Sequence, residues 1–317
     1  MKTAAILFIL LFFHTYQITG QISSETRENE PKLIFDLNVA NDMTFFTDQY
    51  FTSGIQFRVY APFMAKSPFS KILVHAGKNA VNYYALTLTQ NIYTPIYNDT
   101  LILQEIPYPF ASYLLFGNRL ESYNPQHRLK VTSEIQLGVI GSLAGGEIFQ
   151  NTLHNNIAIA DPVEGWENQI SNDLCIQYSA LLEKGVIGAR WLELNVYGGA
   201  ILGVPHTEAQ VGMYARFGFF NDYFQNIGIS KNRKWQAWLF CAGDVNLVAY
   251  NAVLEGGLFN ESPYYLQTIN PVIWHTRFGG TLVYKTIKLE IAQEVISPSY
   301  PTAYWFRWAY ASLMVGF

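Results

Sequence analysis

Stretches in which apolar and polar residues alternate strictly recur along most of this chain. They are clearest at residues 129–139, 192–197, 208–217 and 287–292. Alternation with a period of two places successive side chains on opposite faces of a β-strand. One face of these stretches is continuously apolar, and the other carries, over the set, charges of both signs. The pattern therefore predicts an all-β chain.

A β-sandwich and a transmembrane β-barrel both show this alternation, so composition and the last strand must separate them. Aromatic residues make up 16% of the chain and charged residues only 14%, whereas about a quarter is usual for charged residues. The final stretch, residues 304–317, carries Ala, Leu, Val and a terminal Phe on one face, with aromatics near its far end. An apolar band bounded by aromatic residues is typical of a lipid-facing strand. We therefore expect an antiparallel transmembrane β-barrel.

The first residues have the character of an export signal. Met-Lys-Thr is followed by an apolar run at residues 4–13 and by a polar turn near Gly20. Such a run is too short to span a bilayer and is typical of a cleaved signal peptide. We predict a signal peptide at residues 1–20 and a barrel at residues 21–317, located in the outer membrane of a Gram-negative cell.

Counting the alternating stretches predicts about twelve strands, an even number as single-chain bacterial barrels have. The expected ranges are 33–42, 52–61, 82–92, 110–120, 127–140, 172–183, 189–202, 207–219, 235–250, 271–284, 286–297 and 303–317. With a periplasmic N-terminus, the longest extracellular loop is 141–171. Within it Ile148, Phe149, Thr152 and Leu153 recur at helical spacing and predict a short helix over residues 145–156. Inward Lys130, Glu134, Glu193, Arg216, Lys288 and Glu290 are expected to pair across a largely filled lumen.

Charge and cysteine usage exclude some functions. The net charge is −4 with no basic tract, so nucleic acid is not an expected partner. Cys175 and Cys241 fall in different, non-neighbouring strand candidates, so we expect free thiols and no disulfide framework.

The loop at residues 41–54 is the richest candidate site. It holds Asn41, Asp42 and Thr52 between two expected strands. Asn, Asp, Thr and Gly are also ordinary turn residues, so a plain hairpin loop is the alternative. If residues 33–39 face lipid with their odd-numbered side chains, Asn41 lies on the same outer side. The helix of the longest loop carries His154 on the same rim, although a loop histidine is more often a surface residue.

These residues carry a family resemblance. Asn41-Asp42, Tyr50-Phe-Thr52-Ser-Gly54, Gln90-Asn-Ile-Tyr-Thr-Pro95 and the loop with Gln150, His154 and Gly165-Trp-Glu-Asn-Gln169 resemble, in order, elements of the outer-membrane lipid A 3'-O-deacylase family. The resemblance implies a twelve-stranded barrel that removes 3'-linked acyl chains of lipid A with Ca²⁺. It implies His154 as general base, with Asn41, Asp42 and Thr52 lining the site. Asp42, Asn41 and Asp161 are the implied metal ligands. The implied partners are lipopolysaccharide and the lipids of the outer membrane.

One element departs from the family pattern. Residues 106–112 read Ile-Pro-Tyr-Pro-Phe-Ala-Ser where the family has Arg-Pro-Tyr-Ala-Gly. The basic residue before Pro107 is absent, which leaves the preferred lipid head group open.

Two other functions compete with deacylation. An outer-membrane phospholipase A needs a serine nucleophile near its histidine, and the serines nearest His154 in sequence are Ser142 and Ser171. A non-enzymatic barrel for adhesion or transport is the third possibility.

Overall fold

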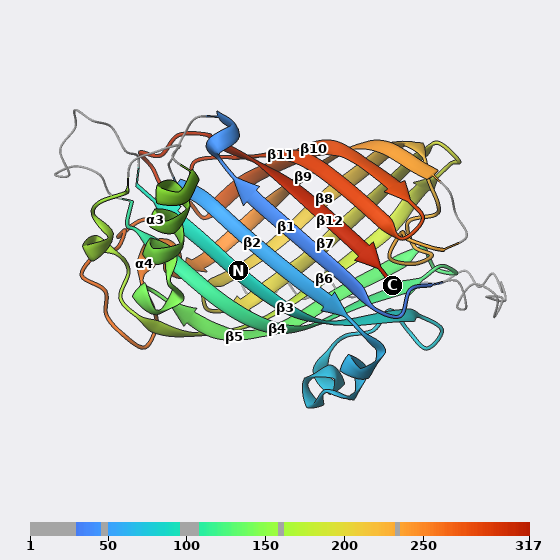
Figure 1. Cartoon of the computed structure of the whole chain (residues 1–317), viewed down its shortest axis with the longest axis horizontal. Helices are drawn as coiled ribbons and strands as arrows, with labels where there is room; N and C mark the ends of the chain where they lie inside the picture. The colour runs from blue at the N-terminus through green and yellow to red at the C-terminus, as the bar shows by residue number, and fades with distance from the viewer. Residues whose placement is uncertain (1–29, 46–49, 96–107, 158–161, 232–234) are drawn as a thin grey trace, which may run out of the picture.

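Twelve antiparallel strands form one closed barrel (Figure 1). The structure, a computed structural model, describes residues 30–45, 50–95, 108–157, 162–231 and 235–317. The strands are β1 (Ile34–Asn41), β2 (Tyr50–Tyr60), β3 (Val81–Thr94), β4 (Ala111–Asn124), β5 (Leu129–Ile140), β6 (Asp173–Gly188), β7 (Leu192–Gly203), β8 (His206–Phe219), β9 (Trp235–Asn251), β10 (Val272–Tyr284), β11 (Ile287–Ile296) and β12 (Phe306–Gly316). The predicted fold class and strand number are confirmed.

Closure occurs between the first and last strands. β1 pairs with β12 from Ile34 opposite Gly316 to Asn41 opposite Ala309. Each remaining strand pairs with its sequence neighbour, so the barrel leaves no open edge in which backbone groups lack partners. We call the end whose connections carry the helices after β5 and β9, at residues 146–157 and 252–255, the loop end. The other end, where residues 30 and 317 lie, is the terminal end.

Within the described residues, the helices are few and short. They are α3 (Gly146–Ile157), α4 (Ala252–Glu255) and the 3-10 helices η1 (Met43–Phe45), η2 (Pro62–Lys66), η3 (Pro68–Ile72), η4 (Ser142–Ala144) and η5 (Trp166–Asn168). Helix α3 confirms the helix predicted in the longest loop. No helix within the described ranges is long and apolar enough to cross a bilayer. The predicted signal peptide, residues 1–20, lies outside the described residues.

The two faces of the wall differ as the alternation predicted. Large apolar side chains such as Leu174, Leu202, Val211 and Leu239 are exposed on the outer face. The inner face carries ion pairs. They join Lys130 to Glu183 (3.2 Å), Arg119 to Glu134 (3.0 Å), Arg216 to Glu193 (2.6 Å) and Lys288 to Glu290 (3.8 Å). The expected pairing of lumenal charges is confirmed. Cys175 and Cys241 are free, as predicted.

Apolar clusters fill the lumen near both ends. At the terminal end, Ile227 and Ile229 of the β8–β9 connection pack with inward residues such as Phe240 and Met314. At the loop end, Tyr50 and Tyr108 pack with Tyr300 of the last loop and with Phe306, the first residue of β12. A cavity of about 610 Å³ with mixed polar and aromatic lining lies inside the barrel. The lumen is a chamber lined by side chains.

Candidate functional site

The end of β1 and the start of β2 bring together three of the predicted site residues. Asn41 is the last residue of β1 and lies opposite Ser53. The backbone N–H of Asp42 donates to the carbonyl of Thr52 (3.4 Å). Because Asp36, Asn38 and Ala40 line the lumenal cavity, the alternate residues of β1, including Asn41, lie on the outer face.

A β-bulge determines where Thr52 lies. Pairing of β2 with β3 passes from Phe51 opposite Tyr93 to Ser53 opposite Ile92, so Thr52 is the extra residue. The hydroxyls of Thr52 and Thr94 are 2.6 Å apart, and both residues are buried. Thr94 shares the outer face of β3 with Ile92, so the bulge directs the Thr52 hydroxyl to the outside of the wall. Bulges commonly re-aim a side chain in this way.

Asp42 is almost entirely buried, with 1% of its surface exposed. Its carbonyl accepts a hydrogen bond from the N–H of Phe45 (2.8 Å) and closes η1. A buried carboxylate is costly unless it is paired, hydrogen-bonded or bound to a cation. The backbone thus brings Asn41, Asp42 and Thr52 close together at the loop end of the wall, and their side chains carry amide, carboxylate and hydroxyl oxygens.

Helix α3 starts directly on the barrel wall. Gly145, with φ of +71°, adopts the left-handed conformation that glycine tolerates best. The N–H of Gly146 donates to the hydroxyl of Ser112 on β4 (3.3 Å). A Cβ at position 146 would lie 2.5 Å from the Ser112 Cβ, so only glycine fits this close approach. The first turn of α3 is thus fixed against β4.

Trp166 holds the helix to the wall from the side. Its indole N–H donates to the Gln150 side-chain oxygen (3.1 Å), and its ring lies 5.0 Å from that of Phe110. Trp166 and Phe110 form a buried cluster with Ile92 of β3, against which Phe149 of α3 packs. The long loop is therefore anchored to the outer faces of β3 and β4. Phe110, one of the residues that departs from the family pattern, is part of this anchor.

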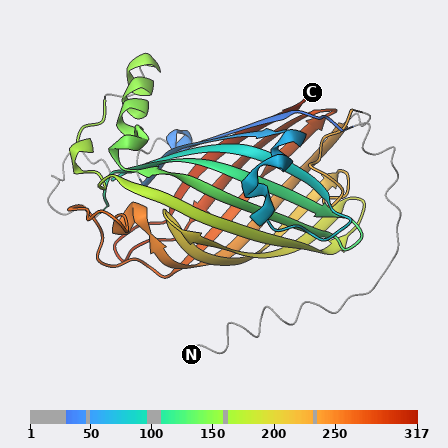
Figure 2. The same ribbon diagram turned by 90° about the horizontal axis from the view of Figure 1, so that it is seen from below.

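His154 lies one helical turn after Gln150. Residues four apart share a helix face, so His154 points to the same side of α3 as the side chain that contacts Trp166. His154 is half-buried, whereas Ile148 is 73% exposed. Both views place α3 and η1 at the same end of the barrel (Figures 1 and 2). The direct meeting of His154 with Asp42 stays a prediction. The proposed metal ligand Asp161 lies outside the described residues.

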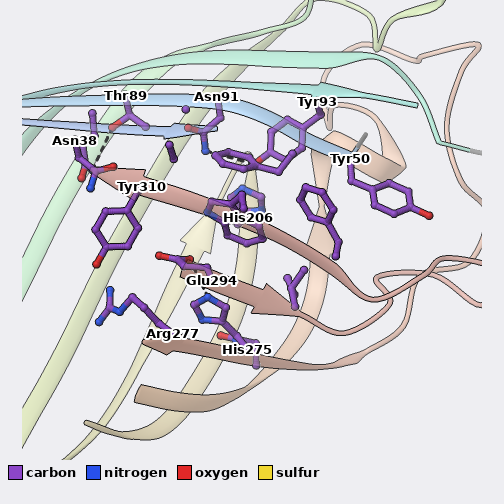
Figure 3. A pocket seen from close by; sticks show the side chains of 18 of the residues that line it. Asn38, Tyr50, Thr89, Asn91, Tyr93, His206, His275, Arg277, Glu294 and Tyr310 are labelled. Carbon is purple, nitrogen blue, oxygen red and sulfur yellow. Dashed lines mark hydrogen bonds and ion pairs between the residues drawn. The ribbon is translucent and has the colours of Figure 1, made fainter. Parts of the chain in front are cut away.

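The lumenal cavity holds a histidine cluster that the sequence did not reveal. The two ring nitrogens of His275 lie 3.3 Å from Asp244 and 2.8 Å from Glu294. Figure 3 shows His275 beside Glu294. The His275 ring stacks on Trp308 at an interplanar angle of 11°. No sequence motif surrounds His275, because its contacts depend on the registers of β9, β10 and β11. None of the predicted site residues lines this cavity.

Tyr50 connects the candidate loop to the cluster at the loop end of the lumen. It has φ of +58°, an uncommon conformation for a bulky residue. Its ring lies 5.0 Å from Tyr108, and its hydroxyl oxygen lies 3.4 Å from that of Tyr300. Burial raises the pKa of the Tyr108 and Tyr300 hydroxyls, so both stay neutral donors. Tyr50 therefore fixes the start of β2, two residues before Thr52.

The donor chemistry at the rim favours a hard cation. Among the described residues, no group of three or more His, Cys, Asp or Glu side chains is arranged to hold a metal ion. The atoms of Asn41, Asp42 and Thr52 that can bind a metal ion are oxygens, which are the ligands that Ca²⁺ prefers. Calcium sites also use backbone carbonyls and water, so these residues fit part of a calcium site.

Trp166→Ala is expected to release α3 from the wall. The change removes the hydrogen bond to Gln150 and the packing against Phe110, and Trp→Ala changes in packed sites cost about 3–5 kcal/mol. We expect much faster protease cleavage within residues 141–171 of the folded barrel, measured by mass spectrometry of the fragments. Trp191→Ala, at an exposed turn of the terminal end, is the control. Equal cleavage of both variants would contradict this anchoring role.

A family model described as outer membrane protein LpxR matches residues 6–317. LpxR from Salmonella typhimurium aligns with a TM-score of 0.72 and 17% sequence identity, over 90% of this chain and 100% of that one. The β domain of the Bordetella autotransporter BrkA aligns with a TM-score of 0.47 and 8% identity, over 91% and 100% of the two chains. Sequence comparison with characterised proteins gives no significant match. The first alignment shows a shared barrel fold.

Proposed function

The chain belongs to the family of outer membrane protein LpxR, and we propose that it hydrolyses the ester-linked 3'-position acyl chains of lipid A. Family membership and the closed barrel place it in the outer membrane of a Gram-negative cell. The loop end then faces the cell exterior and the terminal end faces the periplasm. Lipid A occupies the outer leaflet, so its acyl chains lie beside the outer wall of the loop-end half.

One observation carries the proposal. Asn41 at the end of β1 and Thr52 at the bulge of β2 face the outside of the wall, and α3 is anchored to the same wall by Trp166. An enzyme that takes its substrate from the lumen would place these groups inward. A site on the outer face receives a lipid directly from the membrane.

The proposed chemistry is hydrolysis with His154 as general base. Its neutral imidazole accepts a proton from a water molecule, and the oxygen of that water attacks the ester carbonyl carbon. The bond from this carbon to the sugar oxygen then breaks, and the imidazolium gives the proton to that leaving oxygen, which becomes a sugar hydroxyl. The products are a free fatty acid and a deacylated sugar. A positioned base of this kind contributes about 10²–10⁴-fold to the rate.

Asn41 and Asp42 are the proposed calcium ligands, together with Asp161. When bound, calcium would polarise the ester carbonyl and stabilise negative charge on its oxygen. The Thr52 hydroxyl is held by Thr94, and Thr52 is proposed to orient the ester. Gln150 and Trp166 keep the helix that carries His154 against the wall.

Mass spectrometry of lipid A tests the function. Cells that express the protein in the presence of calcium are expected to contain lipid A that lacks its 3'-linked acyl chains, with those fatty acids released. A phospholipase would instead release fatty acids from phospholipids and leave lipid A intact. An unchanged acylation pattern in both lipid classes would favour a non-enzymatic barrel and overturn the proposal.

A further inference from the structure

The connection between β2 and β3 differs from its neighbours at the terminal end. Turns 125–128, 189–191 and 285–286 are tight, whereas residues 61–80 form a twenty-residue segment that contains η2 and η3. We call residues 61–80 the strap. Figures 1 and 2 show its short helices outside the barrel, on the half nearer the termini. The strap therefore lies against the wall where lipid is expected.

The strap is hydrogen-bonded to three successive strands. The hydrogen bonds join Ser70 to Asn118 of β4 (3.2 Å), Val74 to Ser133 of β5 (2.9 Å) and Ile72 to Tyr178 of β6 (2.8 Å). The three strand residues share the outer face with exposed Phe116, Leu137 and Ile176, which lie an even number of positions away. The strap thus covers polar groups on the outer wall.

The depth of these contacts shows that the strap belongs to the membrane-embedded structure. Asn118 lies near the middle of β4, and Ser133 lies in the terminal half of β5. Both are buried, with 4% and 0% of their surface exposed. Polar side chains at this level would be costly in hydrocarbon without partners. The strap provides those partners, so it is held between the wall and the lipid.

The free surface of the strap is apolar and basic. Phe63, Phe69, Ile72 and Val74 are 44–61% exposed. Lys66, Lys71 and Lys78 are exposed, and residues 61–80 contain no Asp or Glu. No ion pair in the described part of the chain includes these lysines, in contrast to the paired charges of the lumen. Exposed aromatics next to unpaired lysines are the composition of an interfacial membrane anchor.

We propose that the strap binds anionic phospholipid of the periplasmic leaflet, with its apolar side chains among the acyl chains and its lysines at the head-group phosphates. Lysine stems can reach the interface from such a position while the charge stays hydrated. The lipid A site is at the other end of the barrel, so the two surfaces contact different leaflets. A soluble acidic protein would leave the strap's apolar residues, which continue the lipid-facing wall, unexplained.

Lipid selectivity tests this binding in the full-length protein. The barrel is reconstituted in nanodiscs with equal amounts of phosphatidylethanolamine and phosphatidylglycerol, and the lipids retained after extraction are counted by native mass spectrometry. Wild-type protein is expected to retain phosphatidylglycerol preferentially. Each lysine near an anionic surface contributes about fivefold in binding, so K66Q/K71Q/K78Q is expected to lower the preference by about tenfold or more.

A matched variant separates this site from general charge effects. K32Q/K231Q/K285Q removes three exposed lysines from the terminal end but outside the strap, and is expected to keep the preference. F63S/F69S is expected to lower retention of both lipids. Heat-modifiable migration on gels confirms that each variant is folded. An unchanged preference in the strap variant, or an equal loss in both lysine variants, would overturn the proposal. Lipid retention does not depend on deacylation, so the two proposals fail separately.

Discussion

His154→Ala is expected to lower the rate of lipid A deacylation by about 10²–10⁴-fold, the usual contribution of a general base. The side chain lies on a loop helix and not in the barrel core, so the variant is expected to fold and insert normally. The measurement is fatty acid release from purified lipid A by the reconstituted protein. Since the proton acceptor is lost, the effect is expected in kcat more than in KM.

Two other histidines make this test specific. His127→Ala changes a histidine in the turn at the terminal end and is expected to keep full activity. His275→Gln changes the lumenal cluster with Asp244 and Glu294 and is expected to lower stability while activity persists in the folded fraction. If His154→Ala retained activity and His275→Gln lost it, the chemistry would lie in the lumen and the outer-face site would be wrong.

The barrel could be predicted because its strands follow one local rule. Alternation with a period of two needs only the sequence, and all twelve strands lie within a few residues of the expected ranges. The largest differences are at the ends of β4 and β6, which continue to Asn124 and Gly188. At these ends the inward residues, such as Glu121 and Glu183, are held by ion pairs from other strands. Local alternation cannot reveal such partners.

The candidate site was predictable in part. The sequence predicts its residue types and a helix over residues 145–156, which the structure has at 146–157, and the outer position of Asn41 follows from parity. The bulge at Thr52 was not predictable, because it depends on how β2 pairs with β3. Only the family resemblance drew attention to Trp166 in the sequence. Its contact with Gln150 could not be predicted, because it depends on how a long loop folds. Long-range register and loop packing are the information that local patterns lack.

The strap shows the same limit more clearly. Residues 61–80 show neither the alternation of a strand nor the long periodic pattern of a helix. The sequence alone therefore does not predict where they lie in the fold. Their position follows from Asn118, Ser133 and Tyr178, which interrupt the apolar outer faces of three strands. A polar residue on a lipid-facing strand is therefore a usable signal. It indicates that another segment covers the wall at that level.

Removal of calcium is expected to have the second large effect. If the cation polarises the ester carbonyl, chelation removes several kcal/mol of transition-state stabilisation, and deacylation is expected to fall by about 10²–10³-fold and to recover when calcium is added. Asp42→Asn keeps the size of the side chain but removes its charge. This variant is expected to need at least about tenfold more calcium for half-maximal activity, because carboxylate charge sets calcium affinity.

Calcium binding also has a readout that does not require turnover. A cation that binds only the folded state raises the unfolding temperature as its concentration rises. Calcium is expected to stabilise the wild-type protein and to have a much smaller effect on Asp42→Asn. Asp222→Asn, at the opposite end near Arg128, is the control and is expected to respond like the wild type. Equal stabilisation of all three proteins would place the cation elsewhere, and activity that survives chelation would remove calcium from the mechanism. Either result would leave the buried carboxylate of Asp42 with a structural role at the rim.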